Sequence, residues 1–309
     1  MNRRLATIAV VSLSIAAACA IITVLTSTTD WINGDYRSWA GSLRTCGAMP
    51  WKKKSGSGEH RTIDLAWPGG DAIKIKIPAQ VNYQPGQRPE ASVSGNADLV
   101  SHVRLRDGAL EWDTVEWDSL VDCFPSDDLV VQLTGPAVTT WTLNGSGELD
   151  LADVKQDTLR IVVHGSGVVT ASGEVHEASL DAAGSGLADL GRLVAQKTTA
   201  NIRGSAALKL ADTKQDLLRI AMYGSCLVTA SGAANEVSLE SAGSGHADLG
   251  RLIAERASAQ VYGSSIVDLA PRQDADISVY GSALVKLHGA AAARINSQVF
   301  GSGQIKQVP

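Results

Sequence analysis

The sequence predicts an all-β fold, a parallel β-helix or solenoid of about nine rungs of about 20 residues each. The first observation is a Gly-Ser dipeptide that recurs every 18 to 20 residues. A fixed period of this length indicates supersecondary units stacked on one another. The repeated glycines are Gly145, Gly165, Gly184, Gly204, Gly224, Gly243, Gly263, Gly281 and Gly301.

The second observation is a copied block. Residues 151–205 match residues 210–264 at a shift of 59, with 33 of 55 positions identical. A block of three rungs can be inserted without disruption only where each rung contacts its neighbours alone, as in a solenoid.

The third observation is the alternation of apolar and polar residues on both sides of each glycine. Around Gly165, for example, Val163, Val169 and Ala171 are apolar and the residues between them are mostly polar. Period-two alternation predicts two short strands per rung with apolar side chains pointing inward. The glycine would turn the corner between them, because glycine adopts positive φ without steric cost. We expect the serine side chain that follows to hydrogen-bond to its counterpart one rung away.

The chain preceding the repeat falls into three parts. Residues 1–26 carry Arg3 and Arg4 and then an uncharged run, which predicts an uncleaved signal anchor or a cleaved signal peptide, with a lipidated Cys19 as a third reading. Residues 27–58 read as a linker that ends in a basic, Gly-Ser-rich stretch. Residues 59–140 alternate as strands, with a hairpin signal at Asp107-Gly108, and are expected to cap the Gly-Ser repeat region of residues 141–309.

Composition and charge exclude several classes of function. The net charge of −5 and the pI of about 5.7 argue against a nucleic-acid-binding protein. The cysteines show no C-x-x-C motif and no zinc-like spacing, so neither a metal nor a cofactor is predicted. In an oxidising compartment Cys46 and Cys123 could form a disulfide, and two unpaired thiols are an equal alternative.

Three motifs resemble those of the GIN head domain, a family of autotransporter-adhesin-like domains without assigned activity. They are residues 64–70 (DLAWPGG), residues 143–147 (LNGSG) and residues 299–303 (VFGSG). The resemblance covers roughly residues 60–307. It implies an exported, right-handed β-solenoid, often membrane-anchored, with no catalytic residues. Ala206, Cys226, Ser265 and Ala283 replace the second glycine of the Gly-Ser-Gly pattern.

A carbohydrate-active enzyme is an alternative, because parallel β-helices also support polysaccharide-cleaving sites. Asp248 and Asp268 fall on adjacent rungs and could hold a hard cation, although a charged solvent-facing stripe is the simpler interpretation. The run His164-Gly165-Ser166 resembles a base next to a nucleophile, but adjacent strand residues point to opposite faces and Ser166 is simply the serine of the repeat, so no catalytic triad is predicted. The rungs vary in length by only a residue or two, which leaves no long loops to wall a cleft.

A stripe immediately before the repeat glycines carries the candidate site residues. These positions should point outward, and the aromatic ones form a predicted binding stripe: Tyr223, Tyr262, Tyr280 and Phe300. A stacked aromatic ladder could hold glycan rings or a partner surface. The alternative is a ladder that only stabilises neighbouring rungs.

Together these observations predict a non-catalytic binding or adhesion module of the cell envelope. Its membrane partner would be reached through residues 5–26, and the solenoid would face the periplasm or the exterior. An envelope glycan or another surface protein is the expected ligand. A structural envelope scaffold without a ligand, and a carbohydrate-active β-helix enzyme, are the alternatives.

Overall fold

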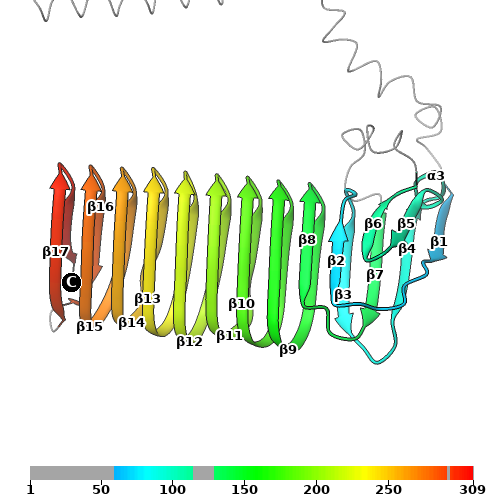
Figure 1. Cartoon of the computed structure of the whole chain (residues 1–309), viewed down its shortest axis with the longest axis horizontal. Coiled ribbons are helices and arrows are strands. Elements are labelled where there is room, and N and C mark those ends of the chain that lie inside the picture. Colours follow the sequence, from blue (N-terminus) through cyan, green and yellow to red (C-terminus); the bar gives the residue numbers. More distant parts are fainter. Residues whose placement is uncertain (1–58, 114–128, 291–292, 309) are drawn as a thin grey trace, which may run out of the picture. The chain divides into compact units, whose positions relative to one another are not determined.

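The computed structural model describes residues 59–113, 129–290 and 293–308. Strands make up 79% of these residues and helix 2%, and the strands coil into a β-solenoid of about eight turns. The all-β solenoid predicted from the Gly-Ser period is therefore confirmed (Figure 1). The nine repeated glycines bound about eight turns because each full turn runs from one glycine to the next.

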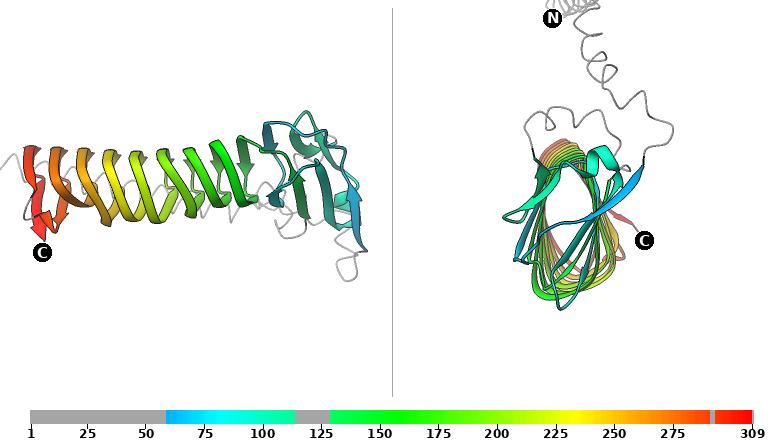
Figure 2. Two further views of the ribbon diagram at one scale, coloured as in Figure 1. Left: turned by 90° about the horizontal axis from the view of Figure 1, so that it is seen from below. Right: turned by 90° about the vertical axis from the view of Figure 1, so that its right-hand side faces the viewer.

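Seven long strands form the central turns of the coil. Their bounds are β9 (Glu148–Gly165), β10 (Val168–Gly184), β11 (Leu187–Gly204), β12 (Ala207–Gly224), β13 (Leu227–Gly243), β14 (His246–Gly263) and β15 (Ile266–Gly281). Each pairs in parallel with the strand before it and the strand after it. Seen along the coil axis, the turns lie over one another as one flattened outline (Figure 2).

The Gly-Ser corners require glycine for two reasons. The φ of Gly165 is 116°, in the region that only glycine adopts cheaply, and a Cβ atom there would lie 2.6 Å from the carbonyl oxygen of Gly145 one turn away. That same carbonyl accepts a hydrogen bond from the backbone N–H of Ser166, at 3.0 Å. The repeated contact that we expected of the serine side chain is made here by the serine backbone.

A second corner lies within each long strand, where the sequence predicted a break between two short strands. In β10 the pairing with β9 shifts register between Ala171 and Gly173, while the hydrogen-bonded ladder continues on both sides. Gly173 has a φ of 123°, and a Cβ atom there would collide with the carbonyl oxygen of Val154. On β9 the facing Asp153 has a φ of 52°. A bulge therefore turns the chain without interrupting the strand.

The core is a thin layer of small and branched side chains between the two long sides of the coil. The inward column before each corner includes Val163, Ala182, Ile202 and Met222, and each is 4% exposed or less. The residues that replace the second glycine point inward as well, since Ala206, Cys226, Ser265 and Ala283 are all buried. Cys226 is a free thiol, and burial raises its pKa, so it stays protonated at neutral pH.

The N-terminal region continues the same sheet. Its elements are β1 (His60–Asp64), β2 (Ala72–Ile75), β3 (Gln80–Pro85), β4 (Glu90–Asn96), α3 (Ala97–Val100), β5 (Val103–Arg106), β6 (Ala109–Trp112), β7 (Leu129–Gly135) and β8 (Thr140–Gly145). Three of its pairings are parallel: β2 with β8, β3 with β9, and β7 with the other edge of β3. Beyond β7 the pairing becomes antiparallel, through β4 to β1.

Large aromatic side chains fill the core of this N-terminal region. Trp67, Trp112 and Trp141 are buried, and the Tyr83 hydroxyl donates to the carbonyl oxygens of Gly135 and Pro136 at 3.1 and 2.8 Å. The predicted hairpin is confirmed, because β5 and β6 pair across Asp107-Gly108. The capping role of residues 59–140 stays a prediction.

The C-terminal end of the coil consists of three shorter strands. These are β16 (Leu284–His288), β17 (Arg294–Gly301) and β18 (Gln304–Val308). Strand β15 pairs with β16 along its first part and with β17 along its second, and β18 follows β16. Val299 occupies an inward position but is 42% exposed, because no further described turn covers it.

Several predicted features lie outside the described residues. They include the targeting segment 1–26, the linker 27–58, and the cysteines Cys46 and Cys123. Within the described ranges the chain contains no helix of the length and hydrophobicity that crossing a bilayer requires.

Candidate binding surface

The predicted binding stripe lies on the outer surface of the coil. Tyr223 is on β12, Tyr262 on β14, Tyr280 on β15 and Phe300 on β17, each immediately before its corner glycine. Their exposed fractions are 37%, 39%, 39% and 54%. We call these four residues the aromatic column.

Three members of the column form a continuous stack. The ring centroids of Tyr262 and Tyr280 are 4.9 Å apart with an interplanar angle of 8°, and those of Tyr280 and Phe300 are 5.0 Å apart at 6°. Parallel pairing sets this geometry, because Tyr262, Tyr280 and Phe300 are register partners on successive turns. Both faces of the Tyr280 ring are therefore covered by neighbouring rings. The stack offers ring edges and hydroxyls to solvent along its length, and a free ring face only at its ends.

Tyr223 stands apart from this stack. Its register partner on β13 is Ala242, whose partner on β14 is Tyr262, so an alanine separates the two tyrosines. The Arg203 guanidinium carbon lies 5.9 Å from the Tyr223 ring centroid, within cation–π range. The Tyr223 hydroxyl donates to Glu240 Oε1 at 3.0 Å, and this hydrogen bond is the main reason that the pKa of Tyr223 is raised.

Polar side chains run beside the stack. Gln260, Ser278 and Gln298 are register partners two positions before the aromatic residues. The Tyr262 hydroxyl donates to Gln260 Oε1 at 3.2 Å. One column further along the strands, Asn296 Nδ2 donates to Asp276 Oδ1 at 3.1 Å. The stack therefore lies within a surface rich in amide and hydroxyl groups.

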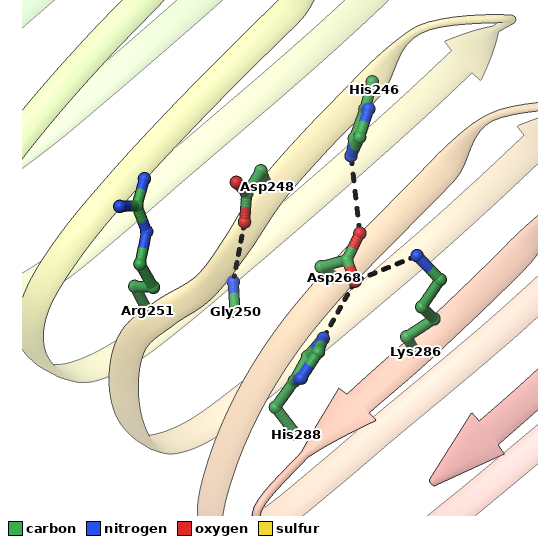
Figure 3. Close-up of a pocket in the computed structure, with 7 residues that line it drawn as sticks. All are labelled: His246, Asp248, Gly250, Arg251, Asp268, Lys286 and His288. Carbon is green, nitrogen blue, oxygen red and sulfur yellow. Dashed lines mark hydrogen bonds and ion pairs between the residues drawn. The ribbon is translucent and has the colours of Figure 1, made fainter. Parts of the chain in front are cut away.

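A separate pocket of about 350 Å³ lies beyond the Gly-Ser corner, and sequence reasoning missed it as a unit. It is lined by His246, Asp248, Gly250, Arg251, Asp268, Lys286 and His288 (Figure 3). At its centre the buried Asp268 carboxylate contacts His288 Nε2 at 2.8 Å, His246 Nε2 at 3.3 Å and Lys286 Nζ at 3.4 Å. Burial acts to raise the pKa of Asp268, but the His288 hydrogen bond, the Lys286 charge and the His246 hydrogen bond together lower it below its ordinary value.

The pocket arises where one turn is shorter than its neighbour. Strand β15 has 16 residues and β14 has 18. The register runs from the pair Leu249 and Leu269 directly to the pair Ile253 and Ala270, so residues 250–252 of β14 have no partner on β15. The 18-residue interval between Gly263 and Gly281 was the signal in the sequence that could have located this pocket.

The two predicted aspartates do not act as a pair in this pocket. The Asp268 carboxylate contacts Lys286 and the two histidines. Asp248 Oδ1 instead accepts a hydrogen bond from the backbone N–H of Gly250 at 3.4 Å. In the described part of the chain no group of three or more His, Cys, Asp or Glu side chains could hold a metal ion. The charged stripe elsewhere consists of complementary neighbours, such as Lys209 Nζ at 2.9 Å from Asp189 Oδ2.

The chain is similar to one described protein family. The family model described as "Putative auto-transporter adhesin, head GIN domain" matches residues 71–217 and 192–291, which together span more than two thirds of the chain. No curated protein matches this chain.

Three solved structures with the same fold come from Parabacteroides species. A "Putative lipid binding protein" from Parabacteroides distasonis is 19% identical with a TM-score of 0.60, a "putative adhesin" from the same species is 17% identical with a TM-score of 0.57, and a "putative adhesin" from Parabacteroides merdae is 16% identical with a TM-score of 0.59. Each comparison covers 82% of this chain and 98% of the other. At these identities the likeness is one of fold.

Proposed function

Because this chain belongs to the family described as "Putative auto-transporter adhesin, head GIN domain", we propose that it is a non-catalytic binding module of the cell envelope whose partner docks on the aromatic column. The basic and then uncharged segment at residues 1–26 supports a membrane tether, with the solenoid outside the cytoplasm.

One observation carries this proposal, the exposed stack of Tyr262, Tyr280 and Phe300. Each of the three residues is more than one third exposed, and together they form one patch. Contiguous exposed aromatic patches mark interaction sites, and tyrosine and phenylalanine are enriched at the centres of protein interfaces. The flanking amide and hydroxyl groups supply the polar rim that such interfaces have.

The geometry of the stack favours a protein partner over a glycan. Sugar rings dock on aromatic faces, and both faces of Tyr280 are covered by its neighbours. What remains along the stack is a row of ring edges and two tyrosine hydroxyls, which suits side chains and backbone groups of a second protein.

A structural scaffold is the second candidate, and the same stack favours it in a different way. Stacked aromatic pairs stabilise by about 0.5–1.5 kcal/mol beyond their buried area, so the ladder could serve only to hold successive turns together. The two functions differ in which property is lost when the rings are removed.

The test is a double substitution, Tyr262→Ser with Tyr280→Ser, in the full chain. Purified protein would be screened against envelope proteins and a panel of envelope glycans, and retention of each hit compared with wild type. We expect retention to fall at least about tenfold, and the melting temperature to fall by less than about 5 °C. The matched control is Asn144→Ser with His164→Ser, two register partners on adjacent turns at the same position before the corner glycine, outside the aromatic column.

Unchanged retention would overturn the binding proposal. So would a fall in retention that only follows the fraction of unfolded protein, because that result assigns the rings to stability alone.

A further inference from the structure

The aromatic column has one gap, at Ala242, and the chain carries an internal reference for it. At the shift of 59 that relates the copied blocks, Ala242 corresponds to Ala183, Tyr223 to His164 and Tyr262 to Arg203. The first block therefore flanks its alanine with a histidine and an arginine, and the second block flanks it with two tyrosines. We call the outward position of Ala242, between Tyr223 and Tyr262, the Ala242 gap.

The spacing of the turns sets the width of this gap. Adjacent turns are about 4.8 Å apart, so the two tyrosines project from positions about 9.6 Å apart, with the small, half-buried Ala242 between them. A flat group at the level of Ala242 would lie about 4.8 Å from each ring, inside the roughly 6 Å limit for a cation over an aromatic face. The existing stack shows that this spacing holds planar groups parallel, at 4.9 and 5.0 Å.

The charge at the gap is negative. Glu240, on the same strand as Ala242 and two positions before it, is exposed, and its hydrogen bond comes from the Tyr223 hydroxyl. No cation among the described residues forms an ion pair with it. Its counterpart in the first block, Asp181, is instead neutralised by Arg160 Nη2 at 2.6 Å and accepts from Asn201 at 3.1 Å.

The far face of Tyr223 shows which ligand such a position accepts. Arg203 lies there, with its guanidinium carbon 5.9 Å from the ring centroid. A guanidinium is planar and hydrogen-bonds to a carboxylate in a fixed geometry, whereas a quaternary ammonium has no N–H to donate to Glu240.

We propose that the Ala242 gap binds an arginine side chain of a protein partner, with the guanidinium between Tyr223 and Tyr262 and hydrogen-bonded to Glu240. This inference rests on the proposed function, since it names the partner chemistry at one end of the aromatic column.

The test measures binding of a fluorescein-labelled Gly-Ser-Arg repeat peptide to the full chain by fluorescence anisotropy. The matched peptides carry lysine or citrulline in place of arginine. We expect the citrulline peptide to bind at least about tenfold more weakly and the lysine peptide about threefold more weakly, because lysine keeps the charge but lacks the planar donor array. Equal binding of the arginine and citrulline peptides would overturn the proposal.

Substitutions locate the binding. Ala242→Tyr fills the gap and should weaken arginine-peptide binding at least tenfold, whereas Ala183→Tyr in the first block should leave it within twofold. Glu240→Gln and Tyr223→Leu should each weaken it at least threefold, and they serve if Ala242→Tyr alters folding. An equal effect of the two alanine substitutions would place the site elsewhere and overturn the proposal.

Two further measurements separate this inference from its premise. Tyr280→Ser with Phe300→Ser removes most of the stack but leaves the gap, so it should lower partner retention while arginine-peptide binding stays within twofold. Unchanged partner retention alone would count against the proposed function. Arginine-peptide binding that changes more than twofold would count against the Ala242 gap. Competition with methylguanidinium should be stronger than with tetramethylammonium; the reverse order would indicate a quaternary ammonium headgroup and overturn the arginine assignment.

Discussion

Residues 151–205 and residues 210–264 fold into equivalent turns, yet they present different surfaces. Asp153 and Asp212 share a positive φ of 52° and 49°, and Gly173 and Gly232 share a φ of 123° and 115°. The outward column instead changes from His164 and Arg203 to Tyr223 and Tyr262. The comparison teaches that the corners are fixed by backbone geometry, whereas the residues of the outer columns are free to change.

The charged stripe shows the same division. Asp189 of the first block is paired with Lys209, and at the shift of 59 the corresponding residues are Asp248 and Asp268. Replacing the lysine by an aspartate would place two carboxylates side by side. Asp268 instead lies in the shortened turn, where Lys286 forms an ion pair with it and His288 Nε2 hydrogen-bonds to it.

The largest predicted effect tests the shared corners. Gly173→Ala and Gly232→Ala should each lower the free energy of unfolding by about 3 kcal/mol or more, because a Cβ atom would collide with the carbonyl oxygen of Val154 or Thr213 at a φ that alanine rarely adopts. Urea denaturation measures both. A loss at one corner without a comparable loss at the other would show that the two blocks are not equivalent.

A medium effect is predicted at the divergent charged position. Asp268→Asn should lower the free energy of unfolding by about 2 kcal/mol at pH 7, since Lys286 loses its counter-charge and one of the two acceptor oxygens becomes an NH2 group. Asp248→Asn, the neighbouring aspartate with a single long hydrogen bond, is the control and should cost less.

The pH dependence of the same pair of proteins follows from the lowered pKa of Asp268. Its contribution is fully present above the ordinary aspartate pKa of about 3.9 and is lost as the pH falls from there through the lower folded-state pKa. Melting temperatures of wild type and Asp268→Asn should therefore converge below about pH 4. A difference that persists unchanged into acid would refute an ionic origin.

The smallest effect is expected inside the core, where two alanines correspond to two serines at the shift of 59. Ala182 and Ala206 correspond to Ser241 and Ser265, whose buried hydroxyl oxygens are 2.7 Å apart. Ser241→Ala alone should cost about 1 kcal/mol, because Ser265 loses its best partner. The double substitution should be nearly neutral, and a double-mutant cycle by urea denaturation decides whether the two serines are coupled.

Much of the fold was predictable because each turn is specified by a local sequence pattern that the repeat shows many times. The Gly-Ser corners, the inward columns and the outward placement of Tyr262, Tyr280 and Phe300 all follow from period-two alternation around a glycine. The second corner was harder, since it is turned by Asp153 on one strand and Gly173 on the next, and no single residue type marks it.

The chemistry of the surface was less predictable because it depends on relations between turns. Asp268 is buried because β15 lacks residues that would pair with residues 250–252 of β14. His246 and His288 are 22 and 20 residues from Asp268 in sequence, and they reach its carboxylate only because their turns stack on its turn. That the ring faces of the stack cover one another depends on side-chain torsions, which period and spacing do not specify.

The pairing of each turn with only its two neighbours has a consequence for how the molecule can evolve. Inserting or deleting a whole block changes the height of the coil in steps of about 4.8 Å per turn, or about 14 Å for a block of three, and leaves every remaining contact intact. The length of the coil along its axis can thus change without any change in the residues of its last turns. Gene duplication can therefore lengthen such a coil by whole turns while the other turns keep their surfaces.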